Sequence, residues 1–373
     1  MISLQEQFLK KVQVFKMYKK LAFFPATRDA CAIARHQSLL QGYTLSHLFM
    51  PDFMNLTNKD IHYIDGGDKN VAFLSNLCES NIASCDTLFL DYDANMDDIA
   101  LYQDAINMAN NLNKKTIISK LLKHRIEDEP IGWPSDSPMN ENSLEDQLYE
   151  IRVPVVMIFS QGSFSDQFAV ELAVREHFIN AGYKVSQIGS VEASQFLGFS
   201  SFPQFIYENR DAYEKIIKLN KYMKNLVDQE ESDLLVIGVP GAILKYNDKI
   251  LNGLGIMPLI VSSAVAGDVS IICMHYSTYK MEYFEQISLL GQYRLGLPIQ
   301  FFNIANVTLA PDMSSDMLKM DYLHLNSEFV LDGVNQFINS SDHYVFNALN
   351  MESSNRACIA LQETLANNAH YMI

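Results

Sequence analysis

Apolar runs of strand length alternate with longer amphipathic stretches along much of the chain. In the first third, the apolar runs are separated by polar turns and by stretches whose apolar residues recur every three or four positions. This alternation predicts a parallel sheet with helices on both faces. The predicted strands are 20–26, 44–51, 86–94 and 114–122, and the predicted helices are 30–43 and 97–112.

A second alternating unit begins at residue 153. One of its strand positions has two candidates, 258–266 and 269–275, because both are short apolar runs. The other predicted strands are 153–160, 184–190, 233–240 and 298–306, and the predicted helices are 167–182, 213–227 and 351–369. The fold class is therefore predicted as α/β, with two Rossmann-like parallel-sheet domains.

The segment between the two units has a different composition. Residues 125–152 are rich in acids and prolines and contain few apolar residues, which predicts a solvated linker. The predicted organisation is an N-terminal helix at 1–19, a Rossmann-like domain at 20–124, the linker, and a second α/β domain at 153–373.

The charge balance of the chain limits its partners. The 373 residues carry a formal net charge of -16, and such a chain repels nucleic-acid phosphates and anionic lipid. The five cysteines form no C-x-x-C motif, which favours reduced thiols in the cytoplasm. The first 20 residues lack the apolar region of a signal peptide, and no run reaches the length of a membrane span.

The stretch VVMIFSQGSFSDQF has the layout of a phosphate-binding loop, with a buried strand, a Gly/Ser-rich turn and a following helix. Such loops use backbone N–H groups, a helix N-terminus and a lysine to hold phosphates. Here Ser160 and Asp166 stand where the two glycines are expected, and Gln167 stands at the lysine position. The loop is therefore predicted to be degenerate. The candidate ligand-binding residues are Ser160, Gln161, Gly162, Ser163, Phe164, Ser165, Asp166 and Gln167.

Asp166 also has a simpler interpretation. It precedes the predicted helix, where a carboxylate can cap the first turn and favour the helix dipole by about 0.3–1 kcal/mol. The turn at Pro240–Gly241 ends another predicted strand, and ligands of open parallel sheets bind outside the carboxyl ends of strands. The loop and this turn are therefore expected to line one cleft, unless both are ordinary tight turns.

Two further groups of polar residues follow strands of the first unit. Arg28, Arg35 and His36 are candidates for binding a carboxylate or phosphate, and the alternative is a helix face in solvent. Asp91 and Asp93 form a D-x-D pair that could hold a divalent metal.

Two neighbouring groups of residues have simpler interpretations. Asp97 and Asp98 would start the next helix. Cys273 and His275 would share a strand face, where a buried cysteine is the simpler interpretation than a reactive pair.

The segment VPVVMIFSQGSFSDQFAVELAVREHFINAGYKVSQIGS, followed by SDLLVIGVPGAI, resembles the peptide-maturation-system proteins of clostridial ribosomal-peptide gene clusters. LAFFPATRDACAIARHQSLLQGYTLSHLFMP, CDTLFLDYD and YLHLNSEFV resemble the same family, so the likeness covers most of the chain from about residue 20. The layout is also similar, more distantly, to P-loop proteins of the D-glutamate N-acetyltransferase type. Members of both groups usually carry a lysine in the loop, so this chain departs from them at Gln167.

The resemblance implies a cytoplasmic accessory protein of peptide natural-product (bacteriocin-type) maturation, built on a P-loop NTPase-type scaffold. It would bind a precursor peptide or a modifying enzyme, and no cofactor is expected. The alternative is a nucleotide- or acyl-CoA-dependent transferase or ligase, with ATP, GTP or acetyl-CoA as ligand. A homo-oligomer, or a heterodimer with an intact P-loop paralogue, fits either case.

Overall fold

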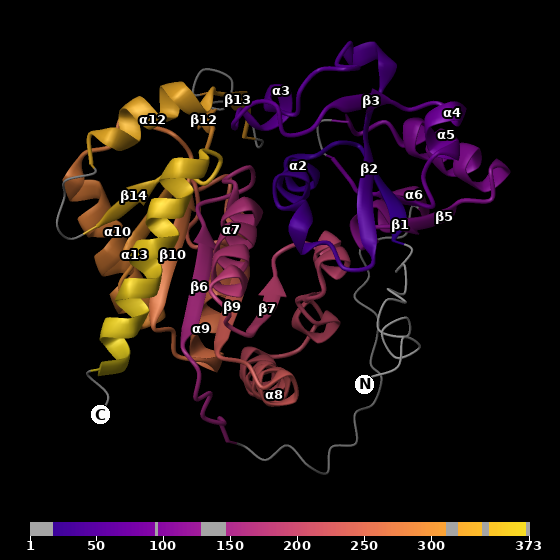
Figure 1. The fold of residues 1–373 in the computed structure, drawn as a ribbon. Coiled ribbons are helices and arrows are strands. Elements are labelled where there is room, and N and C mark those ends of the chain that lie inside the picture. Colours follow the sequence, from indigo (N-terminus) through magenta and orange to yellow (C-terminus); the bar gives the residue numbers. More distant parts are fainter. Residues whose placement is uncertain (1–17, 94–95, 128–146, 311–319, 338–342, 371–373) are drawn as a thin grey trace, which may run out of the picture.

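The computed structural model describes residues 18–93, 96–127, 147–310, 320–337 and 343–370 (Figure 1). The predicted N-terminal helix at 1–19 lies outside these residues, except for its last two, and Lys19 already belongs to the first strand. Most of the predicted linker at 125–152 also lies outside them. None of the described helices combines the length and the apolar character that a bilayer crossing requires.

The first unit is a five-stranded, all-parallel sheet with the strand order β3-β2-β1-β4-β5. Its strands are β1 (Lys19–Phe24), β2 (Tyr43–Met50), β3 (Leu74–Asn76), β4 (Thr87–Leu90) and β5 (Lys115–Ile118). Its helices are α2 (Arg28–Arg35), α3 (His62–Asp65), α4 (Glu79–Ala83), α5 (Ile99–Asn111) and α6 (Lys120–Glu127). The predicted alternation is confirmed here, and β3 was not predicted.

The second unit is a seven-stranded, all-parallel sheet with the strand order β14-β11-β10-β6-β9-β7-β8. The strands are β6 (Val155–Ser160), β7 (Val185–Gly189), β8 (Ser200–Ser201), β9 (Leu234–Ala242), β10 (Val269–Met274), β11 (Phe301–Ile304) and β14 (Tyr344–Phe346). The helices are α7 (Gln167–Asn180), α8 (Ala212–Glu230), α9 (Ile256–Ala264), α10 (Met281–Leu295), α12 (Ser327–Asn335) and α13 (Met351–His370). An antiparallel pair, β12 (Val307–Leu309) and β13 (Tyr322–His324), follows β11 in the chain.

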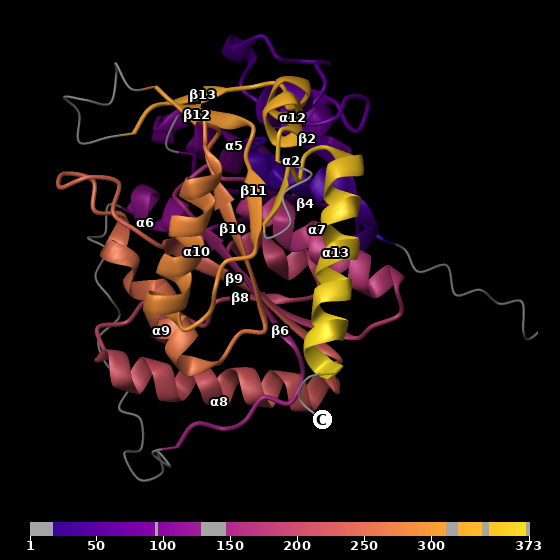
Figure 2. The same ribbon diagram turned by 90° about the vertical axis from the view of Figure 1, so that its left-hand side faces the viewer.

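Strand β6 explains why its sheet is covered on both faces. Val155, Met157 and Phe159 pack with helices α8, α9 and α10 on one side. Val156 and Ile158 pack with α7 and α13 on the other side, and Figures 1 and 2 show these two helical layers. Successive side chains of a strand point to opposite faces. A strand that is buried on both sides therefore has an unbroken run of apolar residues in its sequence. The predicted fold class, two Rossmann-like parallel-sheet units, is thus confirmed.

The two alternatives for one strand position are now resolved. Residues 256–264 form helix α9, and Val269–Met274 forms strand β10 beside β6. Pro258 lies in the first turn of α9, where its missing N–H leaves no helical hydrogen bond unmade. The strand prediction for 258–266 was therefore wrong, and the one for 269–275 was right.

The two sheets share a hydrophobic cluster. Phe23 and Phe89 of the first sheet meet Phe196, which lies in a 3-10 segment of the second unit (Glu192–Leu197), with ring centroids 5.8 and 5.2 Å apart. Phe168 of α7 belongs to the same cluster, and α2 and α7 lie side by side between the sheets (Figure 1). The two units are thus packed together through apolar side chains.

Candidate functional site: a cleft between the two sheets

A cleft of about 960 Å³ lies between the two units, where the carboxyl ends of strands from both sheets face each other. The first unit contributes the ends of β1, β2 and β4, and the second contributes the ends of β6, β7 and β9. Carboxyl ends of parallel strands are the usual ligand-binding edge of such sheets. The walls combine polar and apolar side chains, and the larger apolar and aromatic ones are Met50, Met54, Leu56, Tyr63, Ile64, Met96, Leu121, Phe164, Met320 and Tyr322.

The degenerate loop joins β6 to α7 and lines this cleft from Ser160 to Gln167, except for Gln161. Two of its non-glycine residues have positive φ, Phe164 (59°) and Asp166 (58°). Phe164 packs its ring against Tyr322, with centroids 4.8 Å apart. No described residue accepts a hydrogen bond from the backbone N–H of Gly162, Ser163 or Phe164, so part of the N–H cradle of a phosphate loop remains.

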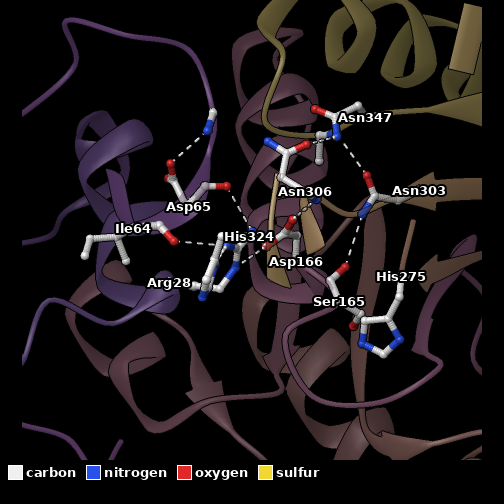
Figure 3. A network of polar contacts seen from close by, with 12 residues as sticks. Arg28, Ile64, Asp65, Ser165, Asp166, His275, Asn303, Asn306, His324 and Asn347 are labelled. Atoms are coloured by element: carbon white, nitrogen blue, oxygen red, sulfur yellow. Dashed lines mark hydrogen bonds and ion pairs between the residues drawn. The ribbon is translucent and has the colours of Figure 1, made fainter. Parts of the chain in front are cut away.

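Asp166 does not cap helix α7. It lies at the N-cap position in a left-handed conformation, and its side chain makes no capping hydrogen bond. Its carboxylate instead accepts hydrogen bonds from Arg28, and from the backbone N–H of Asn306 at 3.0 Å. The predicted capping role is therefore wrong, because a buried cation from the other unit competes for the same carboxylate (Figure 3).

Arg28 uses all five of its N–H groups inside the protein. Nε and Nη2 donate to Oδ1 of Asp166 at 2.8 and 2.6 Å. The remaining donors reach the carbonyl oxygens of Ile64 and Asp65 at 3.1 and 3.0 Å, and Nδ1 of His324 at 3.0 Å. The Arg28 and Asp166 side chains are only 8% and 3% exposed. Arg28 thus lines the cleft, as its place after β1 suggested, but it has no donor left for an anion.

Gln167 occupies the position of the expected lysine and turns inward. Its Nε2 donates to the carbonyl oxygens of Ile158 on β6 and Val239 on β9, at 3.0 and 2.9 Å. The side chain therefore ties two neighbouring strands together at their carboxyl ends. The loop consequently offers no free positive charge to a phosphate.

His275, which follows strand β10, contacts the backbone of the loop from below. Its Nε2 lies 2.7 Å from the carbonyl oxygen of Ser163, so Nε2 carries the proton and donates. Burial lowers the pKa of His275, which favours this neutral form. Gln161 faces the same side, because its Oε1 accepts the backbone N–H of His275 at 3.2 Å. Cys273 is buried in β10, as the simpler interpretation predicted.

Three buried asparagines fix the loop from the second sheet (Figure 3). Asn303 donates to the carbonyl oxygen of Ser165 at 3.2 Å and accepts from the backbone N–H of Ala348 at 2.8 Å. Asn347 donates to Oδ1 of Asn306 at 2.7 Å. Together with the bond from Asn306 to Asp166, these contacts connect the ends of β11 and β14 to the loop.

Pro240 and Gly241 line the same cleft as the loop, but they do not form the predicted turn at the end of a strand. They lie within β9, where the register between β6 and β9 shifts. Gly241 has a φ of 80°, which a residue with a side chain rarely adopts, and its carbonyl oxygen accepts a hydrogen bond from Oγ of Ser160 at 3.3 Å. Strands β6 and β9 are neighbours. The loop and Pro240–Gly241 thus line one cleft.

Arg35 and His36 lie away from the cleft. Arg35 forms a two-bond ion pair with Asp65, from Nε at 2.7 Å and from Nη2 at 2.8 Å. Nδ1 of His36 lies 2.6 Å from Glu176 of α7, across the boundary between the units. Both side chains are already paired with carboxylates of the protein itself. Neither is therefore free to bind an anionic ligand.

Asp91 and Asp93 do line the cleft, together with Asp29 at the start of α2. Burial raises the pKa of Asp91 to about 6, and burial with neighbouring carboxylates raises that of Asp29 to about 7. Among the residues that the structure describes, no three acids, histidines or cysteines are grouped so that they could hold a metal ion. Asp98 caps helix α5 through the N–H of Ala100, as predicted for a helix start.

His275, Tyr322 and His324 were not predicted as site residues. Tyr322 and His324 line the cleft, and His275 lies beneath the loop, against the carbonyl oxygen of Ser163. His275 carried a usable signal, because it directly follows a buried strand at its carboxyl end. Tyr322 and His324 belong to the short strand β13, whose sequence has no strand-like pattern. Burial raises the pKa of Tyr322 to about 12 and lowers that of His324.

No family model matches this chain, and no curated protein matches it either. The fold is similar to the crystal structure of a DUF1611 family protein from Anabaena variabilis, with a TM-score of 0.55 and 9% sequence identity. The likeness covers 92% of this chain and 99% of the other. At this identity it supports the two-unit fold and carries no information about ligands.

Proposed function

We propose that this protein is a cytoplasmic accessory protein of peptide natural-product maturation, and that its cleft holds a segment of the precursor peptide or of a modifying enzyme. The observation that carries the proposal is the character of the cleft. It is large, apolar side chains make up much of its walls, and the one arginine among its described lining residues is engaged by Asp166. Pockets of this kind favour apolar ligands with a few oriented polar groups.

The same observation argues against a nucleotide. A phosphate loop normally supplies a lysine to the terminal phosphates, and here Gln167 donates to strand carbonyls instead. Asp166 adds a carboxylate where a phosphate would approach. The remaining N–H groups of the loop are then available to main-chain carbonyls of a bound segment.

The rim of the cleft also fits a peptide. Tyr63, Met54 and Leu121 line the cleft, and their side chains remain exposed at its edge. Exposed apolar groups that surround a concave site are typical of contact surfaces for partners. A bound segment would cover them and would place its backbone along the loop.

The test is direct binding of the precursor peptides encoded by neighbouring genes, measured by fluorescence anisotropy with labelled peptides. Tyr63→Ser should weaken binding, because Tyr63 lies in the cleft. Tyr293→Ser, which removes an exposed tyrosine from α10, serves as the matched control and should leave binding unchanged. Failure of every neighbouring peptide and enzyme to bind would refute the proposal.

The alternative activity is tested on the same protein by calorimetry with ATP, GTP and acetyl-CoA. Saturable binding of one of them with a Kd below about 100 µM, roughly −5.5 kcal/mol, would overturn the proposal in favour of a transferase or ligase. We expect no such binding.

A further inference from the structure

The first sheet provides a second binding edge inside the cleft. Its strand order, β3-β2-β1-β4-β5, places β1 beside β4, and the chain leaves these strands toward opposite sides of the sheet. A crevice at such a switch point is where ligands of doubly wound sheets bind. Asp29 follows β1, Asp91 follows β4, and both line the cleft.

The charges at this edge are not balanced within the protein. Arg28 is the only lysine or arginine among the described residues that line the cleft, and its five donors are engaged elsewhere. The carboxylate of Asp29 accepts no hydrogen bond from any described residue, whereas that of Asp91 is hydrogen-bonded by the side chain of Ser119 and by the backbone N–H of Tyr92, the latter at 2.9 Å. Arg28 lies near Asp29 and favours its charged form, but it donates no hydrogen bond to it. A carboxylate inside a cavity without a hydrogen-bonded cation favours a cation from outside.

We infer that this edge of the cleft seats a primary ammonium group of the bound ligand, a lysine side chain or an N-terminal amine, against Asp29 and Asp91. The inference rests on the proposed peptide-binding function and specifies the chemistry of the peptide. A charged hydrogen bond between ammonium and carboxylate is roughly twice as strong as a neutral one.

The surroundings favour an organic cation over a metal ion. No three metal-ligand side chains are grouped in the described part of the chain. The adjacent walls carry Met50, Met54 and Met96, and flexible thioether side chains adapt to irregular apolar ligands. A lysine buries its methylene stem on apolar surface while its charged end reaches a polar group, which matches a carboxylate edge beside a methionine wall.

The test uses 1-aminohexane, which has an ammonium group on an apolar chain, and hexan-1-ol, its neutral analogue. Both are titrated into the full-length protein at millimolar concentration, with binding followed by calorimetry. The amine should bind the wild-type protein about tenfold more tightly than the alcohol. Asp29→Asn should remove this preference, and Asp91→Asn should reduce it. Asp104→Asn, on the exposed face of α5, is the matched control and should retain it.

Equal affinity for amine and alcohol in the wild-type protein would overturn the inference, and so would an undiminished preference in Asp29→Asn. These outcomes are distinct from failure of the proposed function. If the amine binds at Asp29 but no precursor peptide encoded by a neighbouring gene binds, the ammonium site is supported and the peptide-binding function is refuted. If a peptide binds equally well after its lysines are replaced by norleucine and its N-terminus is acetylated, the peptide-binding function is supported and the ammonium site is refuted.

Discussion

The ion pair between Arg28 and Asp166 should be a major contributor to the stability of the whole chain. Replacing Arg28 by methionine removes both bonds to Oδ1 of Asp166 and leaves that carboxylate with the backbone N–H of Asn306 alone. The two side chains are 8% and 3% exposed, so water cannot replace the arginine. Breaking a buried pair from one side costs about 3–5 kcal/mol, and we expect Arg28→Met to lower the free energy of unfolding by this amount.

A double-mutant cycle separates the pair from its surroundings. Asp166→Asn keeps an acceptor oxygen and a residue that tolerates positive φ, so its cost should be about 1–3 kcal/mol. The double variant buries no charge and should be more stable than the two single losses predict, with a coupling energy of about 1–3 kcal/mol. Urea denaturation followed by far-UV circular dichroism measures all four proteins. Additive losses, or a cost below about 1 kcal/mol for Arg28→Met, would refute the reasoning.

Three further substitutions test other contacts. Gln167→Ala removes the donor of two buried strand carbonyls and should cost about 1–3 kcal/mol in urea denaturation, whereas Gln195→Ala, on an exposed segment, should cost little. Phe196→Ala removes a ring buried in the shared cluster and should cost about 3–5 kcal/mol, and a loss below about 1 kcal/mol would contradict the packing described here. Burial raises the pKa of Glu171 from 4.5 to about 8. The folded state therefore keeps a proton that the unfolded state releases, and the free energy of unfolding should fall by about 1.4 kcal/mol per pH unit between those values. Denaturation at several pH values checks this slope, which should be shallower in Glu171→Gln; an unchanged slope would show that Glu171 does not cause it.

The local features of the cleft could be predicted from the sequence because they depend on neighbouring residues. The strand, loop and helix around Gly162 follow from an apolar run, a turn composition and a helical period. The meeting of this loop with Pro240–Gly241 follows from the general rule that carboxyl ends of parallel strands share one edge.

The contacts that decide the chemistry of the loop could not be predicted in this way. Arg28 and Asp166 are separated by 138 positions, and no local pattern links them. Capping was the better local interpretation of Asp166, and it failed because a buried arginine competes for the carboxylate. Gln167 turns inward because two adjacent strands present carbonyl oxygens to it, which depends on the strand order. Strand β3 was missed because its three residues, LSN, have no apolar alternation.

The shared cluster also has a consequence for the order in which the chain folds during synthesis. The apolar side of the first sheet that carries Phe23 and Phe89 is completed by Phe168 and Phe196. These rings leave the ribosome only after the whole first sheet has emerged. Until then the nascent first unit exposes an apolar surface, which is the condition that recruits chaperones and promotes aggregation. Residues 19–127 should therefore not form a stable unit alone, and the two sheets are expected to mature in one concerted step.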